Sequence, residues 1–137
     1  MTSRFTEVIV DSSDPRALAE FWCQVLGYHI VDDKHEWVEI APWPDLDSQP
    51  PMAELLDAAG VPTVIFVPDA GGKTGKNRLH LDLLPIDCGQ DEEVERLVAL
   101  GARRVDIGQG DVSWRVLADP EGNEFCVGQV PDRPAGA

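Results

Sequence analysis

Hydrophobic and polar residues alternate along the first strand-like stretch of the chain, residues 4–11. One side of the alternation consists of Thr6, Val8 and Val10, and the other of Phe5, Glu7, Ile9 and Asp11. Because successive side chains of a strand point to opposite faces, this pattern predicts a strand with one apolar packing face and one mixed face. Glu7 belongs to the mixed face.

The next stretch changes from a period of two to a helical period. Asp14 and Pro15 form a favoured helix start, a capping Asp followed by Pro at the first helical position, and Gly27 ends the pattern. The apolar residues at helical spacing in between are Leu18, Phe21, Trp22 and Val25. Residues 28–33 and 36–41 then predict a hairpin, and residues 61–67 predict a buried strand.

The same order of elements recurs about 74 residues later. The run from His80 to Asp87 (HLDLLPID) matches the run from Glu7 to Asp14 (EVIVDSSD), and both end at an Asp placed to cap a helix. Two further segments of the first copy have counterparts in the second. Leu26-Gly27 corresponds to Leu100-Gly101, and Trp37-Val-Glu-Ile-Ala corresponds to Trp114-Arg-Val-Leu-Ala. The chain therefore contains two copies of one strand, helix and strands unit, with Glu7 and His80 at equivalent places.

The predicted first strand of the second copy carries charged side chains on one face. Arg78, His80 and Asp82 alternate with leucines, so a cation, an imidazole and a carboxylate share that face. An outward-facing strand without a function would show the same pattern. The equivalence of His80 with Glu7 favours a functional interpretation.

Residues 42–62 interrupt the repeat, because the second copy crosses the matching interval with three residues, 121–123. The first half of this insertion is too rich in proline for regular structure, whereas residues 52–59 have apolar side chains at helical spacing. Trp43, Leu46 and Met52 could form an apolar lid over a pocket, or the insertion could be a surface excursion.

Composition narrows the classes of function. The chain has 137 residues, 43% of them hydrophobic, enough for one compact domain. A formal charge of -14 argues against binding to nucleic acid or to anionic membrane. The three cysteines lack C-x-x-C spacing, and we find neither a signal-peptide pattern nor a membrane span, so we expect a cytoplasmic protein.

Three segments carry a resemblance to a known family: DPRALAEFWCQVLGY, KNRLHLDL and DPEGNEFCVG. Together with the repeat, they resemble the vicinal oxygen chelate superfamily of glyoxalase I, the bleomycin-resistance proteins and the extradiol dioxygenases. The resemblance spans residues 4–128 and is greatest to the glyoxalase-like branch. It implies an α+β fold in which two tandem βαβββ modules form a curled, cup-shaped mixed sheet.

The resemblance also sets the expected domain organisation. We expect a single glyoxalase-like domain at residues 1–130, with modules at about 4–68 and 76–128, and a flexible tail at 131–137. It further implies a homodimer, because the exposed sheet edges would be covered by a partner.

In metal-dependent members of the superfamily, each module supplies an early and a late ligand. By motif position the early ligands map onto Glu7 and His80. The late position of the second copy is Cys126, and the matching strand of the first copy, residues 61–67, offers neither a carboxylate nor an imidazole. The resemblance thus implies either no cofactor or a divalent metal held by Glu7, His80 and Cys126.

Two functions follow from these residues. In the first, the protein is an enzyme for a small oxygenated or conjugated molecule, with His80 or Glu7 transferring a proton in a lyase or isomerase reaction. In the second, it binds or sequesters a small molecule without a metal, as the bleomycin-resistance branch does. The expected substrate-binding residues are Lys76, Arg78, Asp82, Trp43, Phe66 and Trp114.

Overall fold

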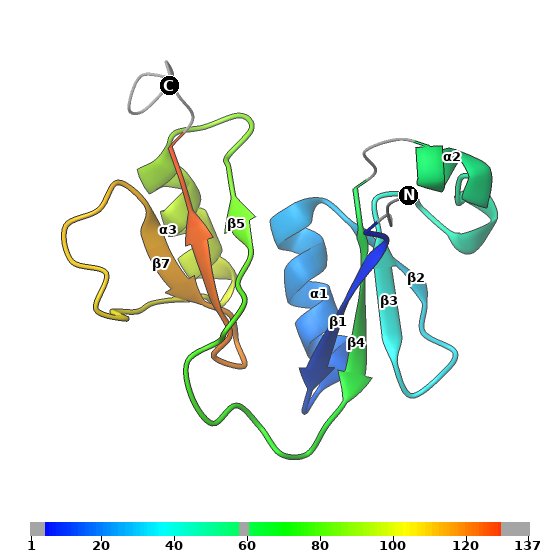
Figure 1. Cartoon of the computed structure of the whole chain (residues 1–137), viewed down its shortest axis with the longest axis horizontal. Helices are drawn as coiled ribbons and strands as arrows, with labels where there is room; N and C mark the ends of the chain where they lie inside the picture. Colours follow the sequence, from blue (N-terminus) through cyan, green and yellow to red (C-terminus); the bar gives the residue numbers. More distant parts are fainter. Residues whose placement is uncertain (1–4, 58–60, 130–137) are drawn as a thin grey trace. The chain divides into compact units, whose positions relative to one another are not determined.

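The computed structural model describes residues 5–57 and 61–129. The chain divides between Gly72 and Lys73 into two compact units, each built on its own four-stranded sheet (Figure 1). The fold is α+β, as predicted, and each sheet has the βαβββ order of elements. In the described part of the chain, no helix has the length and apolar character needed to cross a bilayer.

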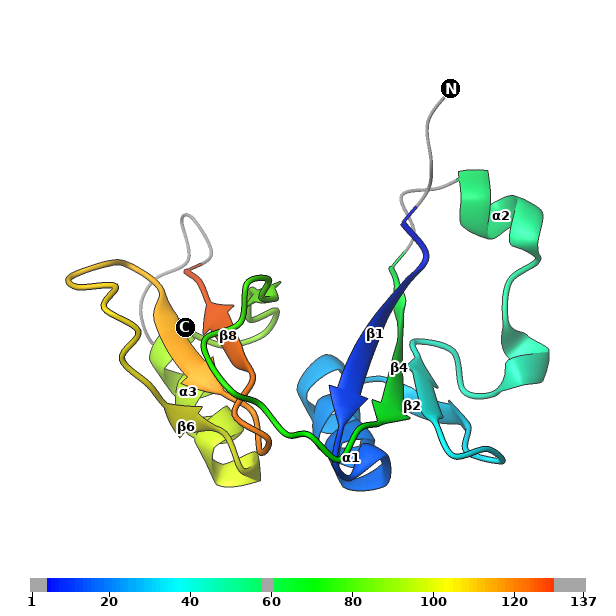
Figure 2. The ribbon, with the colours of Figure 1, turned by 60° about the horizontal axis from the view of Figure 1, so that its bottom comes forward.

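The first unit follows the predicted order of elements, with two short helices in the insertion, one of which was predicted. Its elements are β1 (Glu7–Ser12), α1 (Pro15–Leu26), β2 (His29–Asp32), β3 (Val38–Ala41), a 3-10 helix (Leu46–Ser48), α2 (Met52–Asp57) and β4 (Thr63–Pro68). The sheet order is β1-β4-β3-β2; β1 and β4 are parallel, and the other pairs are antiparallel (Figure 2). The helix predicted for residues 52–59 is present as α2, and residues 58 and 59 lie outside the described ranges.

Helix α1 covers one face of this sheet and forms the core with it. Asp14 caps the helix, accepting a hydrogen bond from the Ala17 N–H at 3.1 Å, and Gly27 ends it in the left-handed conformation with φ of 69°. The buried apolar residues of helix and sheet are Leu18, Phe21, Trp22, Val38, Ile40, Val64 and Phe66. Both predicted helix boundaries are confirmed, and Glu7 lies on the sheet face opposite to this core.

The second unit repeats this topology with shorter strands. Its elements are β5 (Asp82–Leu83), α3 (Gln90–Leu100), β6 (Arg103–Arg104), β7 (Arg115–Ala118) and β8 (Glu124–Val127). The sheet order is β5-β8-β7-β6, which matches the first sheet element by element. Its core contains Val94, Leu97, Leu117, Phe125 and Val127. The predicted internal repeat is confirmed by this equivalence of order and pairing.

Two local predictions for the second unit are wrong. The strand expected around Arg78 and His80 is reduced to Asp82–Leu83. Before it, the Asn77 N–H donates to the Glu124 carboxylate at 3.0 Å, and the Leu81 carbonyl accepts from the Cys126 N–H at 2.9 Å. Asp87 does not cap α3; the N-cap is Gly89, which makes no side-chain capping bond. Three acidic residues in the first turn of α3 still favour its start through the helix dipole.

Candidate functional site

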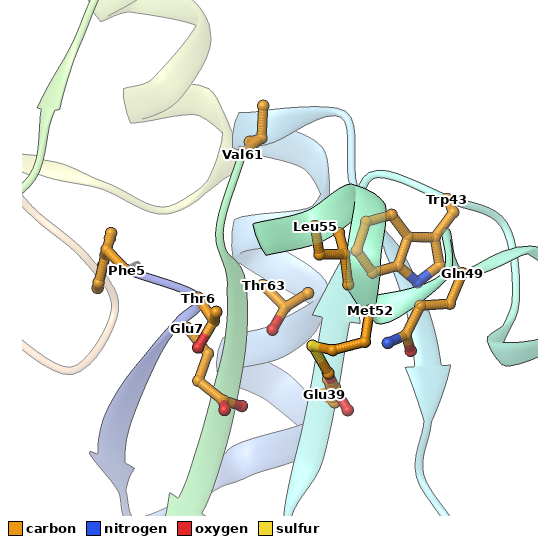
Figure 3. Close-up of a pocket in the computed structure, with 10 residues that line it drawn as sticks. All are labelled: Phe5, Thr6, Glu7, Glu39, Trp43, Gln49, Met52, Leu55, Val61 and Thr63. Carbon is orange, nitrogen blue, oxygen red and sulfur yellow. The ribbon is translucent and has the colours of Figure 1, made fainter. Parts of the chain in front are cut away.

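The mixed face of the first sheet forms the floor of a pocket of about 180 Å³ (Figure 3). Glu7 on β1, Glu39 on β3 and Thr63 on β4 contribute side chains from the sheet, and the insertion contributes Trp43, Gln49, Met52 and Leu55. Phe5, Thr6 and Val61 complete the lining. The pocket therefore lies entirely within the first unit and combines two carboxylates with an apolar wall.

Strand pairing explains why the two carboxylates share this face. Strand β4 lies between β1 and β3, and its Thr63 and Ile65 are opposite Glu7 and Glu39, respectively. Since Thr63 and Ile65 are two positions apart, their partners point to the same side of the sheet. Figure 3 shows Glu7, Thr63 and Glu39 along the floor of the pocket.

Glu39 lies in a partly buried environment that changes its pKa. Its partial burial raises its pKa above the ordinary value of 4.5, while a hydrogen bond from the Thr63 side chain lowers it. The negative charges of Glu7 and Asp32 raise it further, and the net direction is upward. One carboxyl group that keeps its proton to higher pH thus lies beside a second one, an arrangement suited to proton transfer.

The insertion forms the apolar side of the pocket. Trp43 is half-buried, and among the described residues its Nε1–H has no hydrogen-bond partner although it is shielded from solvent. Trp43 and Met52, two of the three residues predicted for a lid, line the pocket, and Leu55 of α2 joins them. A lid that opens and closes remains a prediction.

The second unit contains a separate cluster of candidate ligand groups, His80, Asp82 and Cys126. Their side-chain ligand atoms all lie within 4.8 Å of one another, and the His80 Nε2 to Asp82 Oδ1 distance is 3.0 Å. Burial raises the pKa of the Cys126 thiol, the charge of Asp82 and a hydrogen bond to it act in the same direction, and the charge of Lys76 acts against them. Burial and the neighbouring Asp82 thus favour the protonated form of the thiol.

This donor set fits a divalent metal of intermediate softness. One imidazole nitrogen, one carboxylate oxygen and one sulfur give three protein ligands, the number found in catalytic zinc sites, and all three ligand types bind zinc. Such an ion would polarise a substrate oxygen, and binding it requires that Cys126 lose its proton. Of the predicted metal ligands, the structure brings His80 and Cys126 together and adds Asp82; Glu7 belongs to the other unit, and its part in a metal site remains a prediction.

The remaining predicted site residues have varied environments. Arg78 and Lys76 are exposed, and the Lys76 Nζ donates a hydrogen bond to the Asn77 carbonyl at 3.1 Å. Trp114 belongs to the second unit and is 44% exposed. Phe66 is fully buried on the α1 side of the sheet, which favours a role in the core over one in the pocket.

Sequence reasoning missed several pocket residues, of which Glu39 matters most for the chemistry. A signal for it exists: in the run Trp37-Val-Glu-Ile-Ala, the alternation places Glu39 on the same mixed face as Trp37, whereas Val38 and Ile40 are buried. Leu55 is one of the apolar residues at helical spacing in residues 52–59, whereas Gln49 had no signal, because it lies in the irregular part of the insertion.

Comparisons with known proteins agree with this architecture. A family model described as "Glyoxalase-like domain" matches residues 7–128. A glyoxalase/bleomycin resistance protein/dioxygenase family enzyme from Burkholderia phytofirmans has a TM-score of 0.63 and 17% identity, covering 91% of this chain and 97% of its own. Comparison with curated protein sequences gives no significant match.

Two further solved structures have the same fold at low identity. The fosfomycin resistance protein FosX from Mesorhizobium loti has a TM-score of 0.60 and 14% identity, covering 93% of this chain and 92% of its own. A glyoxalase-related enzyme from Fulvimarina pelagi has a TM-score of 0.59 and 17% identity, and the match covers 99% of this chain and 94% of that enzyme. With the family model spanning both βαβββ units, the chain belongs to the glyoxalase-like domain family of the vicinal oxygen chelate superfamily.

Proposed function

We propose that this protein acts on a small organic molecule bound in the pocket of the first unit, and that Glu7 and Glu39 transfer a proton to and from it. The observation that carries the proposal is the pair of carboxylates on the floor of a pocket with an apolar wall. The Glu7 carboxylate takes a proton from an activated C–H bond of the ligand, and the bond's electron pair moves onto a conjugated oxygen. The Glu39 carboxyl group, whose partial burial favours its protonated form, donates a proton to that oxygen.

This proton transfer is a step that lyase and isomerase reactions of oxygenated or conjugated molecules share. When the step runs backwards, the oxygen returns its proton to Glu39 and the carbon regains a proton from Glu7. Family membership supports a small-molecule ligand, and solved structures with this fold include proteins titled as enzymes and as a fosfomycin resistance protein. A role of His80 in proton transfer, a homodimer and a cytoplasmic location are retained as predictions within this proposal.

Exchange of ligand protons with deuterated solvent tests the proposal. A panel of small keto compounds is incubated with the protein in deuterium oxide, and loss of the C–H signal is followed by NMR. We expect exchange with the wild type and a decrease of at least about 100-fold in Glu7→Gln, the lower end of the usual effect of a general base. The matched control is Asp11→Asn, which removes a charge from the same face of β1 outside the pocket.

Metal-free binding is the second candidate function. The apolar wall formed by Trp43, Met52 and Leu55 favours it, because a sequestering protein needs complementary surface and not a base. Compounds that bind without exchange of any C–H proton, in the wild type as in Glu7→Gln, would favour this function and contradict proton transfer.

A further inference from the structure

We infer that the pocket of the first unit selects a small cationic ligand, in which a protonated amine or a quaternary ammonium group is attached to an apolar or aromatic body. This inference rests on the proposed function, since it takes the pocket to be the ligand site, and it adds the chemical class of the ligand. Three properties of the pocket support the inference: its negative charge, its volume, and the aromatic and apolar side chains of its wall.

The charge of the pocket is negative and uncompensated. Glu7 and Glu39 line it, and no described lining residue is basic. Within the described ranges, neither carboxylate forms an ion pair. Partial burial and the nearby like charges disfavour the ionised form of Glu39. A positively charged ligand stabilises that ionised form, and it therefore gains free energy from both carboxylates.

The groups that face Glu39 agree with this requirement. Glu7 on β1 and Asp32 on β2 both act on Glu39 as like charges, and the side chain of Thr63 on β4 is its neutral hydrogen-bond partner. A cation beside Glu39 replaces this repulsion by attraction. An anionic ligand would add a further like charge, and a neutral ligand would leave the repulsion unchanged.

The size of the pocket limits the body of the ligand. A dry cavity of about 150 Å³ is known to accept benzene. The present pocket of about 180 Å³ therefore has room for one ring with a short substituent. This size matches an aryl-alkyl amine and excludes large polycations.

The wall of the pocket is suited to such a body. Trp43 provides the indole ring, which among aromatic side chains attracts cations most strongly, and Met52 and Leu55 provide flexible apolar surface. A hydrated divalent metal ion fits this wall poorly, because hard cations take six or more oxygen ligands and the side chains of Trp43, Met52 and Leu55 offer none.

Three compounds of similar shape and different charge test the inference: benzylamine, benzyl alcohol and benzoate. Each is titrated into the full chain at low salt and neutral pH by calorimetry, and NMR signals of the Trp43 indole N–H and the Met52 methyl group report the site. We expect benzylamine to bind at least about tenfold tighter than benzyl alcohol, which corresponds to about 1.4 kcal/mol. Benzoate should bind most weakly.

Charge-removing variants make the test specific. Glu7→Gln and Glu39→Gln should each weaken benzylamine binding by about three- to tenfold and leave benzyl alcohol affinity unchanged, whereas Asp11→Asn should change neither. Thermal melts establish that every variant is folded. The exposed position of Glu7 makes its isosteric replacement a mild one.

The outcomes separate the two proposals. Equal affinity for benzylamine and benzyl alcohol, with shifts at Trp43 and Met52, would overturn the cationic class and leave the pocket as a ligand site. Absence of shifts at both residues with all three compounds would overturn both. Magnesium that displaces benzylamine at millimolar concentration in the wild type and not in the Gln variants would contradict an organic cation as the preferred ligand.

Discussion

Replacing Phe66 by Ala provides a direct test of which sheet face belongs to the core and which to the pocket. The Phe66 side chain has no exposed surface and lies on the α1 side of β4, whereas the adjacent Ile65 lies on the pocket side and is half-buried. Removing a fully buried phenyl ring costs about 3 to 5 kcal/mol through lost burial and the cavity left behind. For a chain of this size, that loss lowers the melting temperature by roughly 10 to 20 °C.

Circular dichroism melts and urea titrations measure the loss, and calorimetry with benzylamine below the transition measures binding. We expect Phe66→Ala to bind the ligand with wild-type affinity while it is folded. The control Ile65→Ala should cost only about 1 kcal/mol, since a half-exposed side chain leaves less of a cavity. A loss below about 1 kcal/mol in Phe66→Ala together with weakened binding would refute the assignment and place Phe66 in the pocket.

Three further predictions concern other parts of the molecule. Asp14→Ala should destabilise the protein by about 1 kcal/mol through loss of the α1 cap, and Asp14→Ser should restore most of it in the same melts. Because the fold raises the pKa of Glu39, the unfolded chain loses this proton first as pH rises above about 4.5, so stability falls between that pH and the folded pKa. In urea titrations across pH, Glu39→Gln should remove this fall, and an unchanged profile would contradict the assignment. Cobalt(II) added to the protein should produce a thiolate-to-metal absorption band that Cys126→Ser and His80→Ala abolish; a band that survives in Cys126→Ser would exclude this cluster as its origin.

Much of the fold could be predicted because the two copies share local signals. Trp37 and Trp114 each precede the third strand of their unit by one residue, so the repeated tryptophan located β3 and β7 correctly. The α1 cap at Asp14 could be predicted because capping depends on residues close together in sequence. The resemblance to the superfamily then supplied the way these elements combine.

The missed features depend on contacts between residues far apart in the sequence. The segment before β5 alternates like a strand. Its Asn77 N–H nevertheless donates to the side chain of Glu124, 47 residues later, and not to a backbone carbonyl of a neighbouring strand. The Lys73 Nζ contacts the same carboxylate at 3.1 Å, so one charged side chain of β8 holds this segment at both Lys73 and Asn77. No periodicity in residues 76–81 could indicate such a partner.

The site was harder to predict than the fold, because equivalent backbone positions carry different chemistry in the two units. In the first sheet, Glu39 on β3 is paired with Ile65 on β4, whereas the equivalent pair in the second sheet is Val116 on β7 with Cys126 on β8. In this pair, the first unit has its polar side chain, Glu39, on the third strand, and the second unit has its thiol, Cys126, on the fourth strand. A repeat predicts where strands lie and which side chains share a face, but the first unit uses its face for a carboxylate pair beneath an insertion, and the second uses it for an imidazole, a carboxylate and a thiol. Mapping Glu7 onto His80 therefore located one residue of each group, and the partners of each had to come from its own sheet.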